Sequence, residues 1–245
     1  MLILSIDTST RTGSAAILRD SQVLAEVSGY EETPYSTRLF RDVTLLQERA
    51  KFRLDQIDVF AVAAGPGSFT GLRVGLTAVK AWAEVHRKPI AAISGLEAIA
   101  HEGLIGEPSI GSNTGASNTG FLSPFLDARR GQVYGAVYRR SSHAGIGLEL
   151  ASDESILSLE EFLQLVKEKS SQPAVLVSPT PEVLPASRVA EILPGAGIVQ
   201  VSAALAPAIG RLGFERATRG DLVDSMGLDA NYVRRSDAES AWKDG

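Results

Sequence analysis

A chain of 245 residues can bury a sizeable core in one or two domains, and 44% hydrophobic with 22% charged residues is the ordinary balance of a globular protein. No apolar run approaches the ~20 residues that a membrane helix needs, and the absence of cysteine excludes disulfides and thiolate metal sites. The net charge of −5 argues against binding nucleic acid through bulk charge. We therefore expect a cytoplasmic protein with no membrane partner.

The first segments of the chain predict three antiparallel strands. Residues 2–7 lack the basic start of a signal peptide and reach an acid at Asp7, so we interpret them as a strand. Apolar stretches on either side of a turn predict two more strands, over 14–19 and 23–28. The short connections make these three strands neighbours in one sheet.

The next segments alternate helices and strands. A helix begins near Pro34, because Leu39, Val43 and Leu46 recur at helical spacing up to residue 51. After it we expect strand 59–64, helix 69–87, strand 89–93 and helix 96–102. The strand–helix–strand step at 59–93 indicates an α/β architecture.

The most informative segment is the run Gly65-Pro66-Gly67-Ser68-Phe69-Thr70-Gly71-Leu72-Arg73-Val74-Gly75, which joins a buried strand to a helix. Glycines at such a turn let the backbone approach a bulky or charged neighbour closely. Polar residues form only one narrow stripe on the helix that follows, so most of its surface must be covered. We expect its own sheet to cover one side and another chain to cover the other.

Helices 34–51 and 69–87 together are the expected partner interface. Gly71 and Gly75 lie one turn apart and would permit tight helix contact. The full set of expected interface residues is Leu39, Val43, Leu46, Gly71, Leu72, Gly75, Leu76 and Val79.

A low-complexity segment, residues 106–120, separates two blocks with the same order of elements. It repeats Ser-Asn-Thr-Gly and predicts a flexible loop. After it we expect strands over 122–127, 132–140, 148–151, 175–177 and 198–201, and helices over 158–169 and 203–218. Because three strands, a helix, a strand and a helix recur, we predict two similar halves, 1–105 and 121–245, around a cleft.

Asp7, Thr8 and Ser9 at the end of the first strand are the candidate nucleotide-binding residues. A carboxylate with neighbouring hydroxyls and turn amides can position a metal-bound phosphate. An Asx turn that closes a hairpin explains the same residues, and from this segment alone we favour that interpretation.

Asp127, Arg129 and Arg130 stand at the matching turn of the second block. A plain hairpin, with Gly131 in a left-handed conformation, accounts for them. The functional interpretation places the acid and the two arginines at the mouth of the cleft between the halves. Paired arginines can also form a local basic patch on an acidic chain, but on a protein surface they are more often only solvated, which is the interpretation that we favour.

Four segments together resemble one family. They are Ile6-Asp7-Thr8-Ser9-Thr10, the run from Gly65 to Gly75, the stretch from Asp127 to Tyr134, and the tail Asn231-Tyr232-Val233-Arg234. In order and spacing they are similar to the bacterial TsaB family, also called YeaZ, over nearly the whole chain. The glycine run is the most specific of the four.

The resemblance implies an α/β fold of two ribonuclease-H-like halves in the superfamily of actin, hexokinase and the 70-kDa heat-shock chaperones. It implies a non-catalytic subunit that pairs with a TsaD-type catalytic subunit through its first two helices. With a TsaE-type ATPase, these proteins form N6-threonylcarbamoyladenosine at position 37 of tRNA. The resemblance also implies a homodimer in isolation and tRNA contact only within the complex.

The residues themselves favour a non-catalytic role. His86, His101 and His143 lie in separate segments, and no two of them are four residues apart. The chain therefore lacks a metal-binding motif of two histidines at that spacing on a helix. The resemblance implies a Gly-Gly pair in the adenosine pocket of the second half, but the corresponding region 175–181 has none. The sequence also has no P-loop. We therefore expect no required cofactor and no metal, with weak ATP or ADP binding left open at Asp7.

Two enzymatic alternatives have different requirements. An independent small-molecule kinase or ATPase of the same fold would need ATP turnover that depends on Asp7. A metalloprotease would need a zinc or iron site, which the sequence does not offer. An autonomous tRNA-binding module is disfavoured by the acidic balance.

Overall fold

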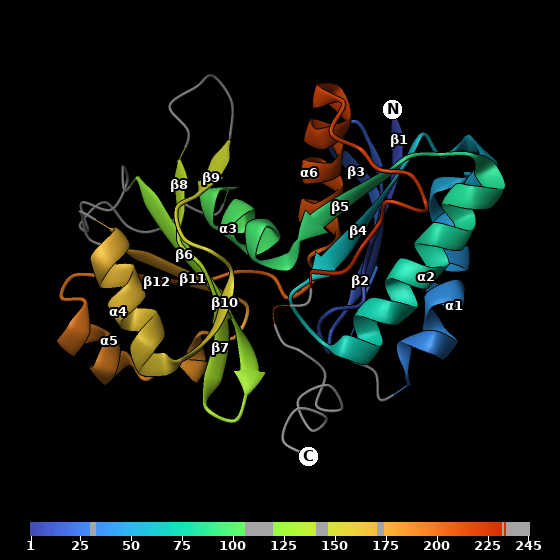
Figure 1. Cartoon of the computed structure of the whole chain (residues 1–245). Coiled ribbons are helices and arrows are strands. Elements are labelled where there is room, and N and C mark those ends of the chain that lie inside the picture. The colour runs from blue at the N-terminus through green and yellow to red at the C-terminus, as the bar shows by residue number, and fades with distance from the viewer. Residues whose placement is uncertain (30–32, 106–119, 141–146, 171–173, 232, 234–245) are drawn as a thin grey trace, which may run out of the picture. The chain divides into compact units, whose positions relative to one another are not determined.

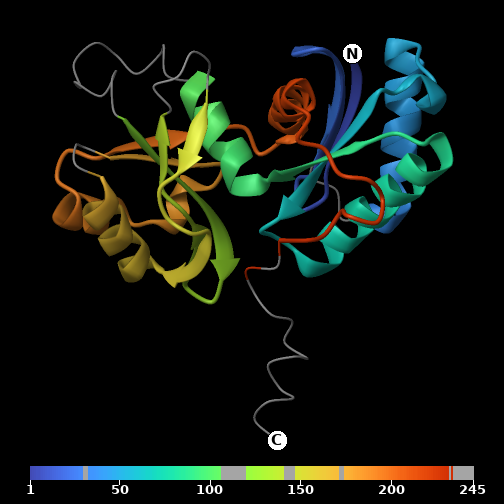
Figure 2. The same ribbon diagram turned by 45° about the horizontal axis from the view of Figure 1, so that its top comes forward.

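A computed structural model describes residues 1–29, 33–105, 120–140, 147–170, 174–231 and 233. Contacts divide the chain into two compact units, Met1–Gly95 with Ala203–Gly245 (unit 1) and Leu96–Ser202 (unit 2). Each unit is built on one mixed sheet with helices packed against it (Figures 1 and 2). No helix among the described residues is long and apolar enough to cross a membrane.

The sheet of unit 1 has the order β3-β2-β1-β4-β5. Its strands are β1 (Leu2–Asp7), β2 (Ser14–Arg19), β3 (Gln22–Ser28), β4 (Val59–Gly65) and β5 (Ile90–Ser94). The first three are antiparallel, whereas β4 and β5 run parallel to β1. Every residue of β4 is buried, as expected of a strand covered on both faces.

Helices cover both faces of this sheet. They are α1 (Tyr35–Ala50) and α2 (Phe69–His86) on one face and α6 (Ala206–Arg219) on the other (Figure 1). Leu4 and Phe60 belong to the apolar cluster under α1 and α2. Ile3 and Ala61, one residue away along each strand, lie against α6. This alternation follows from the two-residue period of a strand.

Helix α6 is fixed tightly to the first sheet. Gly213 lies so close to Ala61 that an added Cβ would come within 2.8 Å of it. The Ser5 hydroxyl donates to the Ala206 carbonyl at 2.7 Å, and the Ala206 amide donates to the Ser14 hydroxyl at 2.9 Å. Residues from 203 onward therefore join unit 1, which differs from the half that we expected over 121–245.

Unit 2 repeats the strand order and directions of unit 1, as β10-β7-β6-β11-β12. Its strands are β6 (Phe121–Arg129), β7 (Gln132–Gly135), β8 (Tyr138–Arg140), β9 (Leu148–Leu150), β10 (Ser155–Ser158), β11 (Val175–Ser178) and β12 (Gly197–Gln200). Its helices are α3 (Gly95–Ile105), α4 (Leu159–Lys169) and α5 (Ala186–Ile192). The predicted recurrence of one order of elements is confirmed.

Two elements of unit 2 were not predicted, namely β10 and α5. The expected strand 148–151 is present as β9, but it pairs with β8, and β10 is the strand that completes the main sheet. The expected strand 132–140 is broken, because β7 pairs with β10 while β8 pairs with β9. The expected flexible loop falls almost wholly on residues 106–119, outside the described residues.

The chain returns to β4 after α6. The Asn231 amide donates to the Ala64 carbonyl at 2.7 Å, and the Asn231 carbonyl lies against Gly65. Of the remaining tail residues in the family resemblance, Val233 is described, while Tyr232 and Arg234 lie outside the described residues. The described part of the tail thus packs beside the glycine run.

Candidate functional site

The turn after β1 centres on a buried carboxylate. Asp7 Oδ1 accepts hydrogen bonds from the Ser9 amide at 2.8 Å and the Ser9 hydroxyl at 2.6 Å. Asp7 Oδ2 is buried and forms no regular hydrogen bond within the part of the chain that the structure describes. Burial raises the pKa of Asp7 above its usual range, and the hydrogen bonds from Ser9 and Thr10 offset this only in part.

The glycine run packs directly on this turn. A Cβ at Gly71 would lie 2.0 Å from the Thr8 carbonyl oxygen, and a Cβ at Gly67 would lie 2.6 Å from that of Ser9. The Thr8 hydroxyl donates to the Gly71 carbonyl at 2.7 Å, and a Cβ at Gly75 would lie 2.4 Å from the same hydroxyl. The glycines therefore let α2 start against the chain's own β1–β2 turn.

Helix α1 holds the other end of the same turn. The Tyr35 hydroxyl donates to the Thr10 carbonyl at 3.0 Å, and the Arg38 guanidinium donates to the Thr12 carbonyl at 2.7 Å. Arg38 is only 3% exposed and forms an ion pair with Asp42. Sequence reasoning missed this clamp, although a charged pair spaced four residues apart was a visible signal.

Thr8 and Ser9 are engaged with neighbouring parts of unit 1. The Thr8 hydroxyl binds α2, while the amide and hydroxyl of Ser9 bind Asp7. The groups proposed to hold a phosphate thus have partners within the chain, as an Asx turn requires. Nucleotide binding at Asp7, Thr8 and Ser9 stays a prediction.

The expected partner-interface residues need a correction, because the structure buries them inside unit 1. They pack in one cluster with Leu4, Ile6, Phe60 and Val62 of the sheet, or directly on the β1–β2 turn. The buried residues are Leu39, Val43, Leu46, Gly71, Leu72, Gly75, Leu76 and Val79. Helical spacing identified the apolar face correctly, but it could not tell whether that face meets the sheet or a partner.

A different set of apolar residues lies on the outer side of α1 and α2. Phe40 is 59% exposed and Val85 is 75% exposed. Trp82 is half-buried, with its ring edge-on to Phe40 at 5.9 Å and stacked on buried Phe60 at 6.1 Å.

Smaller residues continue this surface along α2. Ala81 is exposed and Val74 is half-buried, and both share the outer side of the helix with Val85. We call Phe40, Val74, Ala81, Trp82 and Val85 the outer helix face. Figures 1 and 2 show α1 and α2 side by side on the side of the sheet away from α6.

The β6–β7 turn of unit 2 has an unusual backbone. Arg129, Arg130 and Gly131 have φ values of 63°, 56° and 71°, so two consecutive arginines adopt the left-handed region. Each non-glycine residue there costs about 1–2 kcal/mol. Asp127 Oδ1 accepts a hydrogen bond from the Arg129 amide at 2.7 Å. The expected position of this turn at a cleft between the halves stays a prediction.

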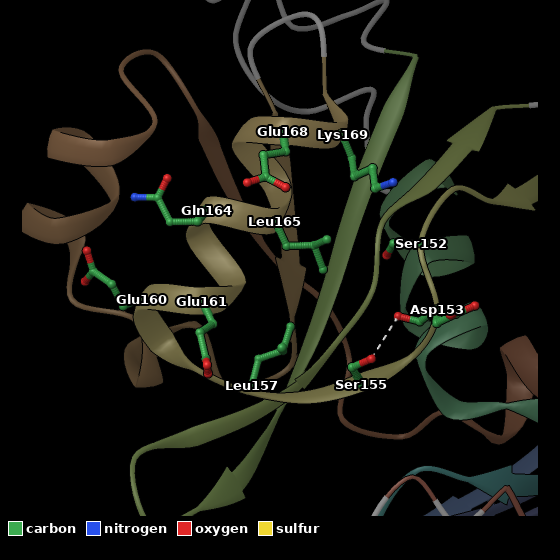
Figure 3. A pocket seen from close by; sticks show the side chains of 10 residues that line it. All are labelled: Ser152, Asp153, Ser155, Leu157, Glu160, Glu161, Gln164, Leu165, Glu168 and Lys169. Carbon is green, nitrogen blue, oxygen red and sulfur yellow. Dashed lines mark hydrogen bonds between the residues drawn. The ribbon is translucent and has the colours of Figure 1, made fainter.

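An acidic hollow beside α4 is explained by local contacts (Figure 3). Asp153, Glu160, Glu161 and Glu168 line it, together with Lys169. Glu161 accepts a hydrogen bond from an amide at the start of α4, and Glu160 pairs with an arginine of α5. Among the described residues, no group of three or more histidines or acids could hold a metal ion.

Comparisons with known proteins identify the family. The model of the family described as TsaD, tRNA N6-adenosine threonylcarbamoyltransferase, matches residues 34–190. A Bacillus subtilis (strain 168) protein named tRNA threonylcarbamoyladenosine biosynthesis protein TsaB is 31% identical over 242 residues, which cover 99% of this chain and 98% of the relative. The chain belongs to the TsaB family.

Solved structures show the fold expected for the TsaB family. YeaZ from Pseudomonas aeruginosa superposes with a TM-score of 0.71 at 22% identity, covering 94% of this chain and 99% of that one. An activator of 2-hydroxyisocaproyl-CoA dehydratase from Clostridium difficile, with ADPNP bound, superposes with a TM-score of 0.50 at 12% identity. The match covers 90% of this chain and 97% of that one. The fold is α/β, with two ribonuclease-H-like halves that share one strand order.

Replacing Gly71 tests whether the glycine run is built for the β1–β2 turn. Alanine usually stabilises a helix by about 1 kcal/mol over glycine. Here the new Cβ would overlap backbone at Thr8, so Gly71→Ala should instead lower the free energy of unfolding by about 2 kcal/mol or more. Gly197→Ala is the control, since nothing lies within 4 Å of its Cβ position. Urea unfolding that showed equal effects would contradict the close contact.

The raised pKa of Asp7 predicts how stability depends on pH. A folded-state pKa above the unfolded value means that stability is lost as the pH rises through this range. Asp7→Asn keeps an acceptor for Ser9 but cannot ionise, so it should be more stable than the parent at pH 7. The difference should shrink toward pH 4.

Thermal unfolding between pH 4.5 and 8 measures this difference for Asp7→Asn and the parent. A destabilisation that stays constant over the whole range would mean that Asp7 Oδ2 accepts an essential hydrogen bond as a carboxylate. Ser9→Ala is a useful companion, because it removes one donor to Asp7 and should raise the pKa of the carboxyl further.

Proposed function

We propose that this chain is a non-catalytic subunit of tRNA threonylcarbamoyladenosine formation. In this role it docks through its outer helix face on a TsaD-type catalytic subunit, which modifies the adenosine at position 37 of tRNA. Membership of the TsaB family supports the pathway, since the B. subtilis relative is named for it. A cytoplasmic location belongs to the same proposal.

The exposure of Phe40 and Val85 is the observation that carries the proposal. Large apolar side chains on neighbouring helices are costly to leave in water, and burying each releases about 1.5–3 kcal/mol. Trp82 fixes the position of Phe40 by ring contact, so the surface is ordered before a partner arrives. Two antiparallel helices of a partner could lie across α1 and α2 as in a helix bundle.

We propose that the same surface mediates self-association in the absence of the catalytic subunit. A two-fold axis would place the outer helix face of one copy on that of another, because such interfaces are self-complementary. We therefore propose a homodimer for the isolated chain and competition between this dimer and the TsaD-type complex.

The contacts around Asp7 support a non-catalytic role. Thr8 and Ser9 are bonded to α2 and to Asp7, which leaves a nucleotide with few unoccupied donors at this turn. We propose that ATP or ADP binds here weakly at most and that the chain requires no cofactor. Nucleotide hydrolysis then falls to a TsaE-type ATPase, and tRNA is bound only within the complex.

Introducing a charge into the outer helix face tests the docking proposal. Phe40→Asp and Val85→Asp should each weaken binding to the TsaD-type subunit at least about 100-fold, because truncating or charging an interface anchor costs several kcal/mol. Leu24→Asp is the matched control. Leu24 is likewise a large exposed apolar residue, with 40% of its surface exposed, but it lies on β3. Calorimetry measures the affinity, and sedimentation measures self-association.

Reconstitution with each protein omitted in turn completes the test. Modification of tRNA should require this chain and should fall in parallel with the affinity of the Phe40→Asp variant. Equal modification without the chain would overturn the proposal. The kinase or ATPase alternative would gain support if the isolated chain hydrolysed ATP and Asp7→Asn abolished that turnover.

A further inference from the structure

We propose that the β6–β7 turn of unit 2 is an RNA-backbone contact, in which the guanidinium groups of Arg129 and Arg130 bind phosphates of the tRNA. The inference rests on the proposed function, because it assigns to this chain a share of tRNA binding within the complex. The ligand is recognised by its phosphate charge and not by its base sequence.

The geometry of the turn is the first argument. Arg129 pairs with Gln132, so Arg130 and Gly131 are the two central residues of a hairpin whose φ values are both positive, as a type I′ turn requires. Asparagine or glycine normally fills the first central position, since a residue with a larger side chain is strained there. Arg129 adds a second left-handed residue just before it.

The backbone of the turn does not favour arginine at these two positions. Glycine would give the same turn with less strain at both, and Asp127 already holds the backbone through the Arg129 amide. Both arginine side chains are exposed, so neither position contributes to the apolar core. Strained residues retained at the surface of a rigid element are typical of binding sites.

The chemistry of the side chains gives the class of ligand. Two adjacent guanidinium groups present planar sets of donors that match phosphate oxygens. The turn between β6 and β7 is a hairpin tip at the lower end of these strands in Figure 1. Such a local contact is compatible with a chain of net charge −5, because one or two phosphate contacts need no basic surface as a whole.

The test uses the complex assembled with the TsaD-type and TsaE-type proteins and a fluorescently labelled tRNA. Three double variants separate the effect of charge from that of backbone strain. R129A/R130A removes the two charges and keeps the strain, R129G/R130G removes the charges and relieves the strain, and R129K/R130K keeps the charges. The control is R139A/R188A, which changes the net charge equally. Arg139 and Arg188 are exposed in the same unit and ion-paired with Glu149 and Glu160.

Anisotropy titrations between 50 and 200 mM salt, chosen to span the range where phosphate contacts respond, measure affinity and its salt dependence. We expect R129A/R130A and R129G/R130G to bind tRNA about tenfold more weakly, with a salt slope reduced by about 1.5–2. R129K/R130K should keep the slope, and R139A/R188A should keep both. R129G/R130G should also melt a few degrees higher than the parent because the strain is gone.

Unchanged tRNA affinity and slope in R129A/R130A would overturn the inference. Loss of assembly with the TsaD-type or TsaE-type protein, at unchanged tRNA affinity of the assembled fraction, would also overturn it by identifying the turn as a protein contact. The proposed function is judged separately, because it fails if the parent chain does not bind the TsaD-type subunit. The arginine variants leave the outer helix face intact.

Discussion

Contact between the backbone of α2 and the β1–β2 turn is the constraint on which unit 1 depends. At Gly67 and Gly71 the two backbones approach so closely that a single methyl group would overlap a carbonyl oxygen. This contact brings the start of α2 to the end of β1, beside Asp7. Arg38 and Tyr35 of α1 then hold the far end of the same turn. One short turn therefore sets the positions of both helices relative to the sheet.

The positions of the two helices explain the outer helix face. Their main apolar sides pack against the sheet, so any residue available to a partner must lie on the opposite side of each helix. Phe40 and Val85 are the large apolar residues exposed there. Phe40 rests on half-buried Trp82 through a ring contact, and this arrangement favours binding because little further ordering is needed when a partner covers it. The function proposed here follows from that arrangement.

Unit 2 uses the same topology for a different surface. Its sheet repeats the strand order of unit 1, and its first hairpin occupies the place that the β1–β2 turn has in unit 1. In unit 1 that turn packs against two helices and buries Thr8 and Ser9, whereas in unit 2 it exposes Arg129 and Arg130. Of the two matching turns, the first organises the packing of its unit and the second presents two adjacent arginines, so function can diverge on a shared topology.

The sequence by itself determined the elements and the family. Apolar periodicity located β1 to β5 and both helices of the docking surface, and the glycine run together with three weaker segments indicated the TsaB family. It did not locate β10 or α5, because both are short and depend on pairing or packing partners distant in the chain.

Only the tertiary structure decided what each face does. Leu39 and Leu72 were correctly identified as apolar helix residues, but the sheet and not a partner covers them, and periodicity carries no information on what lies opposite a face. Likewise, α6 belongs to unit 1 because Gly213 fits against Ala61, a contact between residues 152 positions apart that no local pattern encodes. The sequence pattern indicates which residues are buried, whereas the whole fold determines which contacts bury them.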